Sequence, residues 1–268
     1  MNLLSVAATI VFAWFTVGAV DARPPTGPGA VMPPVGPPSV AQLVERIDDL
    51  HKRRDDKTAF AEEQALALQA LARAPQEYEV LWRAARVAFW ASDDTSRGTD
   101  ERSRIGKEGW DLAERAIAAN PNRVEGPYWA AVCMGNYALG LGVVKALSMG
   151  MEGKFRERLS RAEQLDARYE HGGIATAWGR FFAKLPWPKR DRGEAERRLR
   201  RAIEINPYSL RARVYLAGMY LDDDRPADAK RLLDEVSAAA PGRYDPPEER
   251  RAKGMGADLM PRVAAKLK

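Results

Sequence analysis

Apolar side chains recur every three or four residues along most of the chain from residue 39 onward, which is the spacing of amphipathic helices. Short breaks rich in proline, glycine and aspartate separate these stretches. No stretch alternates apolar and polar positions with β-branched enrichment, so the pattern predicts helices and no sheet. The expected helices include residues 40–54, 58–73, 102–120, 127–151, 154–165 and 247–268.

The most regular part of the pattern lies between residues 194 and 241. Pro207 and Pro241 stand 34 residues apart, and each closes an amphipathic helix. An alanine stands twelve residues before each of these prolines, and the segment between them carries Leu216, Ala217 and Tyr220 at spacing i, i+1, i+4. A 34-residue period of two helices with these positions resembles the tetratricopeptide repeat.

The same closing position can be followed through the rest of the chain. It falls at Pro75, Pro121, Ala167, Pro207 and Pro241, with spacings of 46, 46, 40 and 34 residues. The spacings predict an all-α, degenerate tetratricopeptide-repeat solenoid of about five helix pairs over residues 39–244. Residues 245–268 are expected to form a C-terminal capping helix, because solenoids need a polar outer end.

Glycines predict two interruptions in these helices, because each costs roughly 1 kcal/mol against alanine in a helix interior. The long apolar stretch 127–151 contains four glycines, and we expect it to break near Gly140 and Gly142. The last helix is expected to be interrupted between Gly254 and Gly256. The pair after His171, Gly172–Gly173, predicts a turn.

The N-terminal 38 residues differ from the rest. Residues 3–20 are an unbroken apolar or small-residue run, and Ala22 ends a small-residue cleavage pattern, so residues 1–22 are interpreted as a signal peptide of an exported, periplasmic protein. The run is also long enough to act as an uncleaved anchor, which would be the chain's membrane attachment. Residues 23–38 hold seven prolines and three glycines and predict an extended linker.

Composition narrows the chemistry. Cys133 is the single cysteine, so an intrachain disulfide and a cysteine-based zinc site are excluded, and His51 and His171 are the only histidines. No phosphate loop or nucleophile elbow is present, so we expect neither an enzyme nor a cofactor. The net charge of +5 is mild. The basic stretch 189–201 lacks interleaved aromatic residues and is interpreted as a solvated helix face rather than a nucleic-acid site.

Candidate binding residues are those that the repeat does not require. Trp90 and Trp129 fall at positions expected to face the concave groove, although tryptophans in such arrays more often fill the core. Polar groups interrupt otherwise apolar helix surface at Arg83, Asn136, Lys145 and Arg180. A ligand carboxylate would satisfy them, and so would an intramolecular partner such as Glu125 or Glu170.

One arrangement is more specific than the repeat. The segment HGGIATAWGRFFAKLP from His171, the EGPYWAA segment from Glu125 and the GVVKAL segment from Gly142 together resemble the T-component of tripartite ATP-independent periplasmic (TRAP) transporters, over about residues 80–238. The resemblance implies a helical periplasmic protein that oligomerises around a pore. It also implies association with a solute-binding component and delivery of a small hydrophobic or organic-acid ligand. Unlike many members, this chain has no cysteine for lipidation.

Two functions therefore stay open. The first is a non-enzymatic binding protein that holds a protein partner or small organic ligand in its groove, as an accessory component of a solute transporter. The second is a structural or envelope-assembly scaffold without a small-molecule site. A closed, aromatic-lined cavity would favour the first, and an open polar trough would favour peptide or protein binding.

Overall fold

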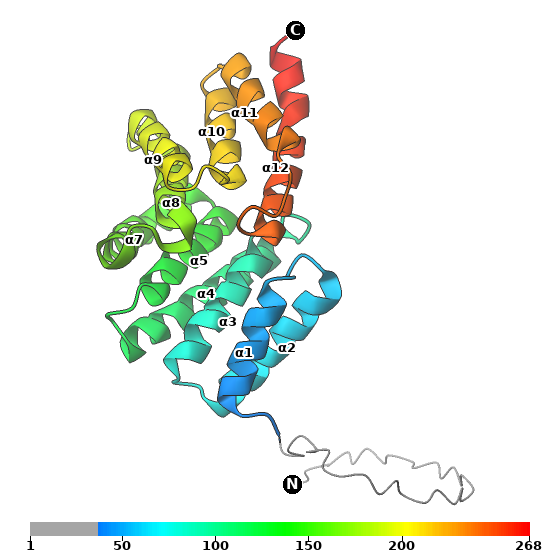
Figure 1. The fold of residues 1–268 in the computed structure, drawn as a ribbon. Helices are drawn as coiled ribbons and strands as arrows, with labels where there is room; N and C mark the ends of the chain where they lie inside the picture. Colours follow the sequence, from blue (N-terminus) through cyan, green and yellow to red (C-terminus); the bar gives the residue numbers. More distant parts are fainter. Residues whose placement is uncertain (1–36) are drawn as a thin grey trace, which may run out of the picture. The chain divides into compact units, whose positions relative to one another are not determined.

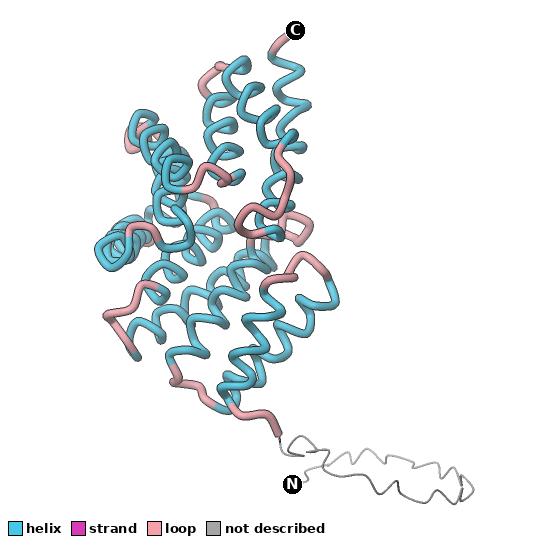
Figure 2. Tube along the Cα trace, in the orientation of Figure 1, coloured by secondary structure: helices cyan, strands magenta, loops and turns pink. Residues whose placement is uncertain are grey.

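The computed structural model describes residues 37–268, which form twelve helices and, over this part of the chain, no strand (Figures 1 and 2). The expected signal peptide and nearly all of the expected linker lie outside the described residues. The helices are α1 (Val40–His51), α2 (Lys57–Arg73), α3 (Tyr78–Ser92), α4 (Thr99–Ala119), α5 (Glu125–Leu141), α6 (Val143–Ser148), α7 (Met151–Asp166), α8 (Tyr169–Lys184), α9 (Arg192–Ile205), α10 (Leu210–Asp222), α11 (Pro226–Ala238) and α12 (Pro246–Lys266).

Successive helices pack as pairs, which confirms the predicted helical-repeat solenoid. The pairs are α1 with α2, α3 with α4, α5 with α7, α8 with α9, and α10 with α11. Helix α12 packs on α10 and α11, where a capping helix was expected. None of the helices in residues 37–268 is long and apolar enough to cross a bilayer.

Side-chain caps define where several helices begin. Ser39 accepts a hydrogen bond from the backbone N–H of Gln42, whose side chain in turn accepts from the Ser39 N–H. Asp56 and Asp191 each accept a hydrogen bond from the backbone N–H three residues later, at the start of α2 and α9. These contacts satisfy backbone donors that a helix leaves unpaired at its first turn.

Alanines and glycines let the paired helices approach closely. Ala113 and Ala116 of α4 and Ala195 and Ala202 of α9 are fully buried, at the contact positions that the repeat predicts. At Gly106, an added Cβ would lie 2.8 Å from the backbone nitrogen of Tyr137, so α4 touches the backbone of α5 there. Cys133 lies in the same interface and is a core residue, as the sequence predicted.

The two expected interruptions have different outcomes. The break in the long apolar stretch is confirmed, because α5 ends at Leu141 and Gly142 has φ of +86°, a conformation that favours glycine. The interruption of the last helix is wrong: α12 continues through Gly254 and Gly256. Gly256 is buried against Val236, where a side chain would be crowded, so this glycine serves packing rather than termination.

The C-terminal segment returns to the first repeats. Arg54, which follows α1, forms an ion pair of 2.6 Å with Asp245, 191 residues away, and Arg250 of α12 pairs with Asp55. Arg251 donates to the backbone oxygen of Trp90 at 2.8 Å. The start of α12 therefore closes the concave side of the solenoid against α1–α3.

We expect Gly106→Ala to lower the free energy of unfolding by about 1–3 kcal/mol, because the added methyl group must push α4 from the α5 backbone. Gly153→Ala is the matched control on α7, where nothing lies within 4 Å of the added carbon. It should raise stability by about 0.5–1 kcal/mol through helix propensity alone. Urea unfolding followed by circular dichroism measures both, and equal effects would contradict the close packing at Gly106.

Candidate ligand cavity

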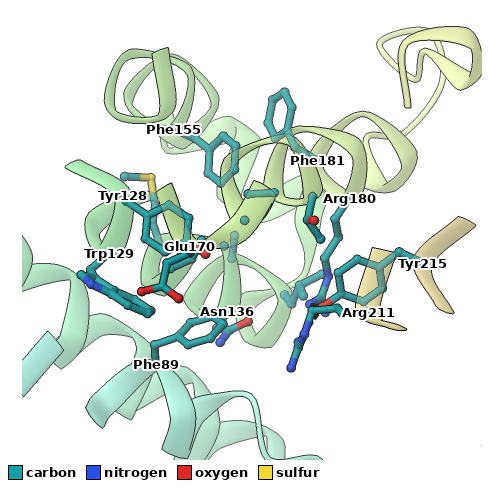
Figure 3. Close-up of a pocket in the computed structure, with 18 of the residues that line it drawn as sticks. Phe89, Tyr128, Trp129, Asn136, Phe155, Glu170, Arg180, Phe181, Arg211 and Tyr215 are labelled. Atoms are coloured by element: carbon teal, nitrogen blue, oxygen red, sulfur yellow. Dashed lines mark hydrogen bonds between the residues drawn. The ribbon is translucent and has the colours of Figure 1, made fainter. Parts of the chain in front are cut away.

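A cavity of about 200 Å³ lies inside the curve of the helices. Residues of α3, α5, α6, α7, α8 and α10 line it, and the segment around Tyr244–Glu248 closes one side. Its wall has an apolar part and a charged part. Figure 3 shows Phe155, Tyr128 and Trp129 on one side of the space, and Arg180, Arg211 and Tyr215 on the other.

Aromatic rings form most of the apolar part. Tyr128 packs edge-on against Trp129 with ring centroids 4.9 Å apart, and Phe155 stacks on Phe181 at 4.6 Å. Phe89 of α3 lies 5.5 Å from Trp129 and completes this surface. Tyr128 and Trp129 are buried by their neighbours and still border the cavity, so the rings serve the core and line the cavity together.

Asp93 organises the charged part. This carboxylate, at the end of α3, is buried and lies 2.7 Å from Nη1 of Arg211, 3.6 Å from Nη1 of Arg251 and 3.7 Å from Nη1 of Arg180. Arg211 also binds Glu248 through Nη2 at 2.8 Å. Burial alone would raise the pKa of Asp93, but the surrounding arginines, Arg211 first, hold it below its usual range. The cluster therefore holds three positive charges, on its guanidinium groups, and two negative charges, on Asp93 and Glu248. Its net charge is +1.

Arg180 is the least satisfied of these arginines. Its Nη1 donates to the hydroxyl of Tyr215, its guanidinium lies 4.5 Å from the centre of that ring, and its Nε has no partner although it is buried. The contact with Asp93 is longer than a normal hydrogen bond. An anionic group in the cavity would supply the missing acceptor, and Arg offers paired donors for carboxylate or sulfonate.

The turn into α8 places an unpaired carboxylate in the cavity. Glu170, His171 and Gly172 have φ of 52°, 51° and 90°, so two residues other than glycine adopt the left-handed conformation in succession. This confirms the predicted turn and costs on the order of 1–3 kcal/mol for each such residue. The conformation points the Glu170 carboxylate into the cavity, between Tyr128 and Trp129 (Figure 3).

Glu170 borders the cavity and keeps solvent-exposed surface there. Burial of the rest of the residue among protein atoms raises the pKa of its carboxyl group, against the opposing effect of Arg86 and Arg54. Asp245 raises the pKa further. The carboxyl group of Glu170 therefore lies beside the aromatic rings and ionises less readily than that of an ordinary glutamate.

His51 belongs to the same wall. Its Nδ1 lies 2.7 Å from Oε1 of Glu63, which is fully buried. Burial lowers the pKa of His51 well below its usual value and raises that of Glu63 to about 7. We infer that the pair is held mainly by a hydrogen bond between weakly charged groups rather than by a full ion pair.

Four of the six sequence-predicted site residues line the cavity. They are Trp90, Trp129, Asn136 and Arg180. Asn136 donates to the hydroxyl of Ser92 at 3.0 Å, so its intramolecular partner is already present. Trp90 donates to the backbone oxygen of Arg54 at 3.0 Å.

The other two lie elsewhere. Arg83 forms hydrogen bonds of 2.6–3.0 Å with Asp48 and Glu79, which is the intramolecular alternative that the sequence left open. Lys145 is exposed on α6 and does not border the cavity. The basic stretch 189–201 falls largely on α9, where its arginines pair with Glu163, Glu194 and Glu196.

Several lining residues had no local signal. Tyr244, Asp245 and Glu248 reach the cavity because the start of α12 folds back toward the first repeats. Arg211 of α10 reaches it beside Asp93, which lies 118 residues away in the sequence. Arg86 did have a local signal in the sequence, because it replaces the small residue expected at that position of the repeat. In the structure its Nη2 donates to Asp48 at 2.8 Å, beside the cavity.

This stacked-pair architecture defines a helical-repeat protein of the tetratricopeptide type. The fold is similar to that of TTC0263, a thermophilic tetratricopeptide protein of Thermus thermophilus, with a TM-score of 0.60 and 18% identity over 85% of this chain and 99% of that one. Residues 43–259 match the family model of regulator of microtubule dynamics protein 1-3, and the chain belongs to that family. No curated protein matches the chain. The transporter T-component resemblance is not confirmed by these matches.

We expect Asp93→Asn to lower the free energy of unfolding by about 3–5 kcal/mol at neutral pH, because it leaves buried arginines without their counter-charge. Since the pKa of Asp93 is depressed, its contribution is present above pH 3.8 and is lost as pH falls through the folded-state pKa. The loss on acidification should therefore be smaller in the variant.

Glu108→Gln is the control, because Glu108 pairs with Arg104 on the surface of α4. It should change stability by less than about 1 kcal/mol. Urea unfolding across a pH series measures both variants. An Asp93→Asn protein as stable as the control would rule out a structural role for the buried cluster.

Proposed function

We propose that this protein is a non-enzymatic binding protein whose central cavity holds a small amphipathic organic anion. The observation that carries the proposal is the mainly apolar, aromatic-lined cavity with Arg180 on its charged wall, where a buried Nε has no acceptor. A polar trough, which would favour an extended peptide, does not match this lining.

The volume limits the ligand. A cavity of about 200 Å³ is modestly larger than the about 150 Å³ cavity that suffices for benzene. The apolar body of the ligand is therefore about the size of one or two fused rings, or a short aliphatic chain. It would lie against Trp129 and Phe155, while its acid group meets Arg180 and the hydroxyl of Tyr215.

The tetratricopeptide-type fold also supports a second function, a scaffold for protein–protein interaction. In that case the outer surface would carry the function and the cavity would be filled by solvent. The family is named for the regulation of microtubule dynamics, which is an activity of this second kind. Specific, saturable binding of a small anion separates the two functions.

Other parts of the sequence-based hypothesis stay predictions. Export to the periplasm, oligomer formation and a role beside a solute-binding transporter component are proposals that the N-terminal pattern and the T-component resemblance support. Sequencing the N-terminus of the native protein and determining its partners by native mass spectrometry would test them together.

Arg180→Gln should weaken binding of naphthalene-2-sulfonate about tenfold or more, because hydrogen bonds to a charged group are worth about 1.5–3 kcal/mol. Binding of 2-naphthol, which has the same rings and no charge, should change far less. Lys145→Gln, on the exposed side of α6, should leave both unchanged. Isothermal titration calorimetry measures the affinities, and no binding of either compound to the wild type would refute the proposal.

Glu170 should make binding depend on pH. The carboxyl group of Glu170 is neutral at a pH below its raised pKa. Above that pKa it is ionised and repels a bound anion. The affinity for naphthalene-2-sulfonate, which is charged throughout, should therefore rise as pH falls from neutral toward 4.5, the usual value for glutamate. The repulsion corresponds to about fivefold or more.

Glu170→Gln removes that charge. The variant should bind the sulfonate more tightly than the wild type at neutral pH and show a flatter pH profile. Arg86, Arg54, Asp245 and His171 also face Glu170, and the two arginines stay charged throughout this range. The His51–Glu63 pair of the same wall, with the pKa of Glu63 at about 7, is a further source of pH dependence that would remain in the variant. An unchanged profile in the variant would exclude Glu170 as the titrating group.

A further inference from the structure

Two short segments at one end of the cavity combine exposed apolar side chains with an excess of positive charge. They are residues 143–149, which form α6 and its end, and residues 184–190, which join α8 to α9. Val144, Met149 and Trp187 are 72%, 54% and 87% exposed, and they are three of the six exposed large hydrophobic residues in the described part of the chain.

All the charged side chains of the two segments are positive. The segments contain Lys145, Lys184, Lys189 and Arg190 and no aspartate or glutamate. Of these four side chains, only Lys189 forms an ion pair with another of residues 37–268. Its partner is Glu152, at the start of α7. This pair holds residues 184–190 against the start of α7, which directly follows residues 143–149 along the chain.

The same segments form one end of the cavity. Val143, Ala146 and Leu147 of α6 border it, as do Lys184 and Leu185 from the other segment. Glycines with φ of +86° and +73°, Gly142 and Gly150, stand on both sides of α6, so this helix of six residues is joined to its neighbours through conformations that side chains resist.

From these observations we propose that residues 143–149 and 184–190 form a docking surface for an anionic lipid bilayer. The surface fits a bilayer for three reasons. Tryptophan prefers the boundary between headgroups and hydrocarbon, the neighbouring prolines leave Trp187 protruding rather than folded onto the domain, and lysines and arginines attract acidic headgroups.

The proposal extends the proposed function, since a cavity that opens toward a bilayer would exchange an apolar ligand without exposing it to water. It stands on different residues, however. Docking needs Val144, Trp187 and Lys145, whereas ligand binding needs Arg180 and the aromatic wall.

A local probe tests the docking surface in the full chain. An environment-sensitive fluorophore, nitrobenzoxadiazole, is attached to the introduced thiol of Val144→Cys or of Trp187→Cys. Cys133 is fully buried and stays unlabelled. Leu68→Cys and Leu267→Cys are matched controls, because these residues are 68% and 47% exposed and lie outside the two segments. A local readout is needed because the apolar run 3–20 can attach the chain to a vesicle by itself.

Vesicles of phosphatidylcholine and phosphatidylglycerol in equal parts should shift the emission of the labels at 144 and 187 to the blue, and should leave the labels at 68 and 267 unchanged. Pure phosphatidylcholine should give a much smaller shift. Adding Lys145→Glu and Lys189→Glu should lower the vesicle-binding constant, measured by lipid titration of the label, by about fivefold or more for each lysine replaced.

The outcomes are distinguishable. Labels at 144 and 187 that stay in water while the chain binds vesicles would overturn the docking surface and assign these residues to a protein partner. Equal shifts at all four positions would overturn it as well. Binding of naphthalene-2-sulfonate without vesicles reports on the cavity separately, so a labelled variant that keeps this affinity and fails to dock refutes only the bilayer surface.

Discussion

The buried carboxylate of Asp93 is the contact on which the cavity depends. It receives arginines from three helices, α8, α10 and α12, and it lies at the end of a fourth, α3. Helices of a solenoid normally touch only their neighbours in sequence, so a repeat array has no intrinsic reason to close. Here a single charge, shielded from water, joins an early repeat to the last helices, where one unpaired partner would be costly.

Hydrophobic packing and this ionic closure have different roles. The alanines at the repeat contacts and the glycine at 106 determine how closely each pair nests, and they would do so in an open array. The pairs Arg54–Asp245 and Arg211–Asp93 span 191 and 118 residues and hold the last helices against the early repeats. Beside the cavity that they border, the left-handed turn at Glu170 is retained despite its conformational cost, which is typical of positions held for function.

The sequence predicted the parts of this structure that repeat locally. The prolines and alanines at fixed spacing identified the helix pairs, and Gly142 identified the break between α5 and α6. The prediction was wrong at Gly254 and Gly256, because a glycine required by tight packing has the same local pattern as one that ends a helix. Arg180 and Arg83 were equivalent as polar residues on apolar surface, and only the three-dimensional position of Asp48 separates them. The charged wall needed contacts between distant segments, which no periodicity encodes.

The closing segment around residues 241–251 comes from nearly the last tenth of the chain. During synthesis, domains form from the N-terminus as the chain leaves the ribosome. The early repeats can stack while translation continues, but they present an open basin lined by Phe89, Tyr128 and Trp129 until the final residues emerge. The aromatic part of the cavity wall is thus in place before the segment that carries Asp245 and Glu248 reaches it.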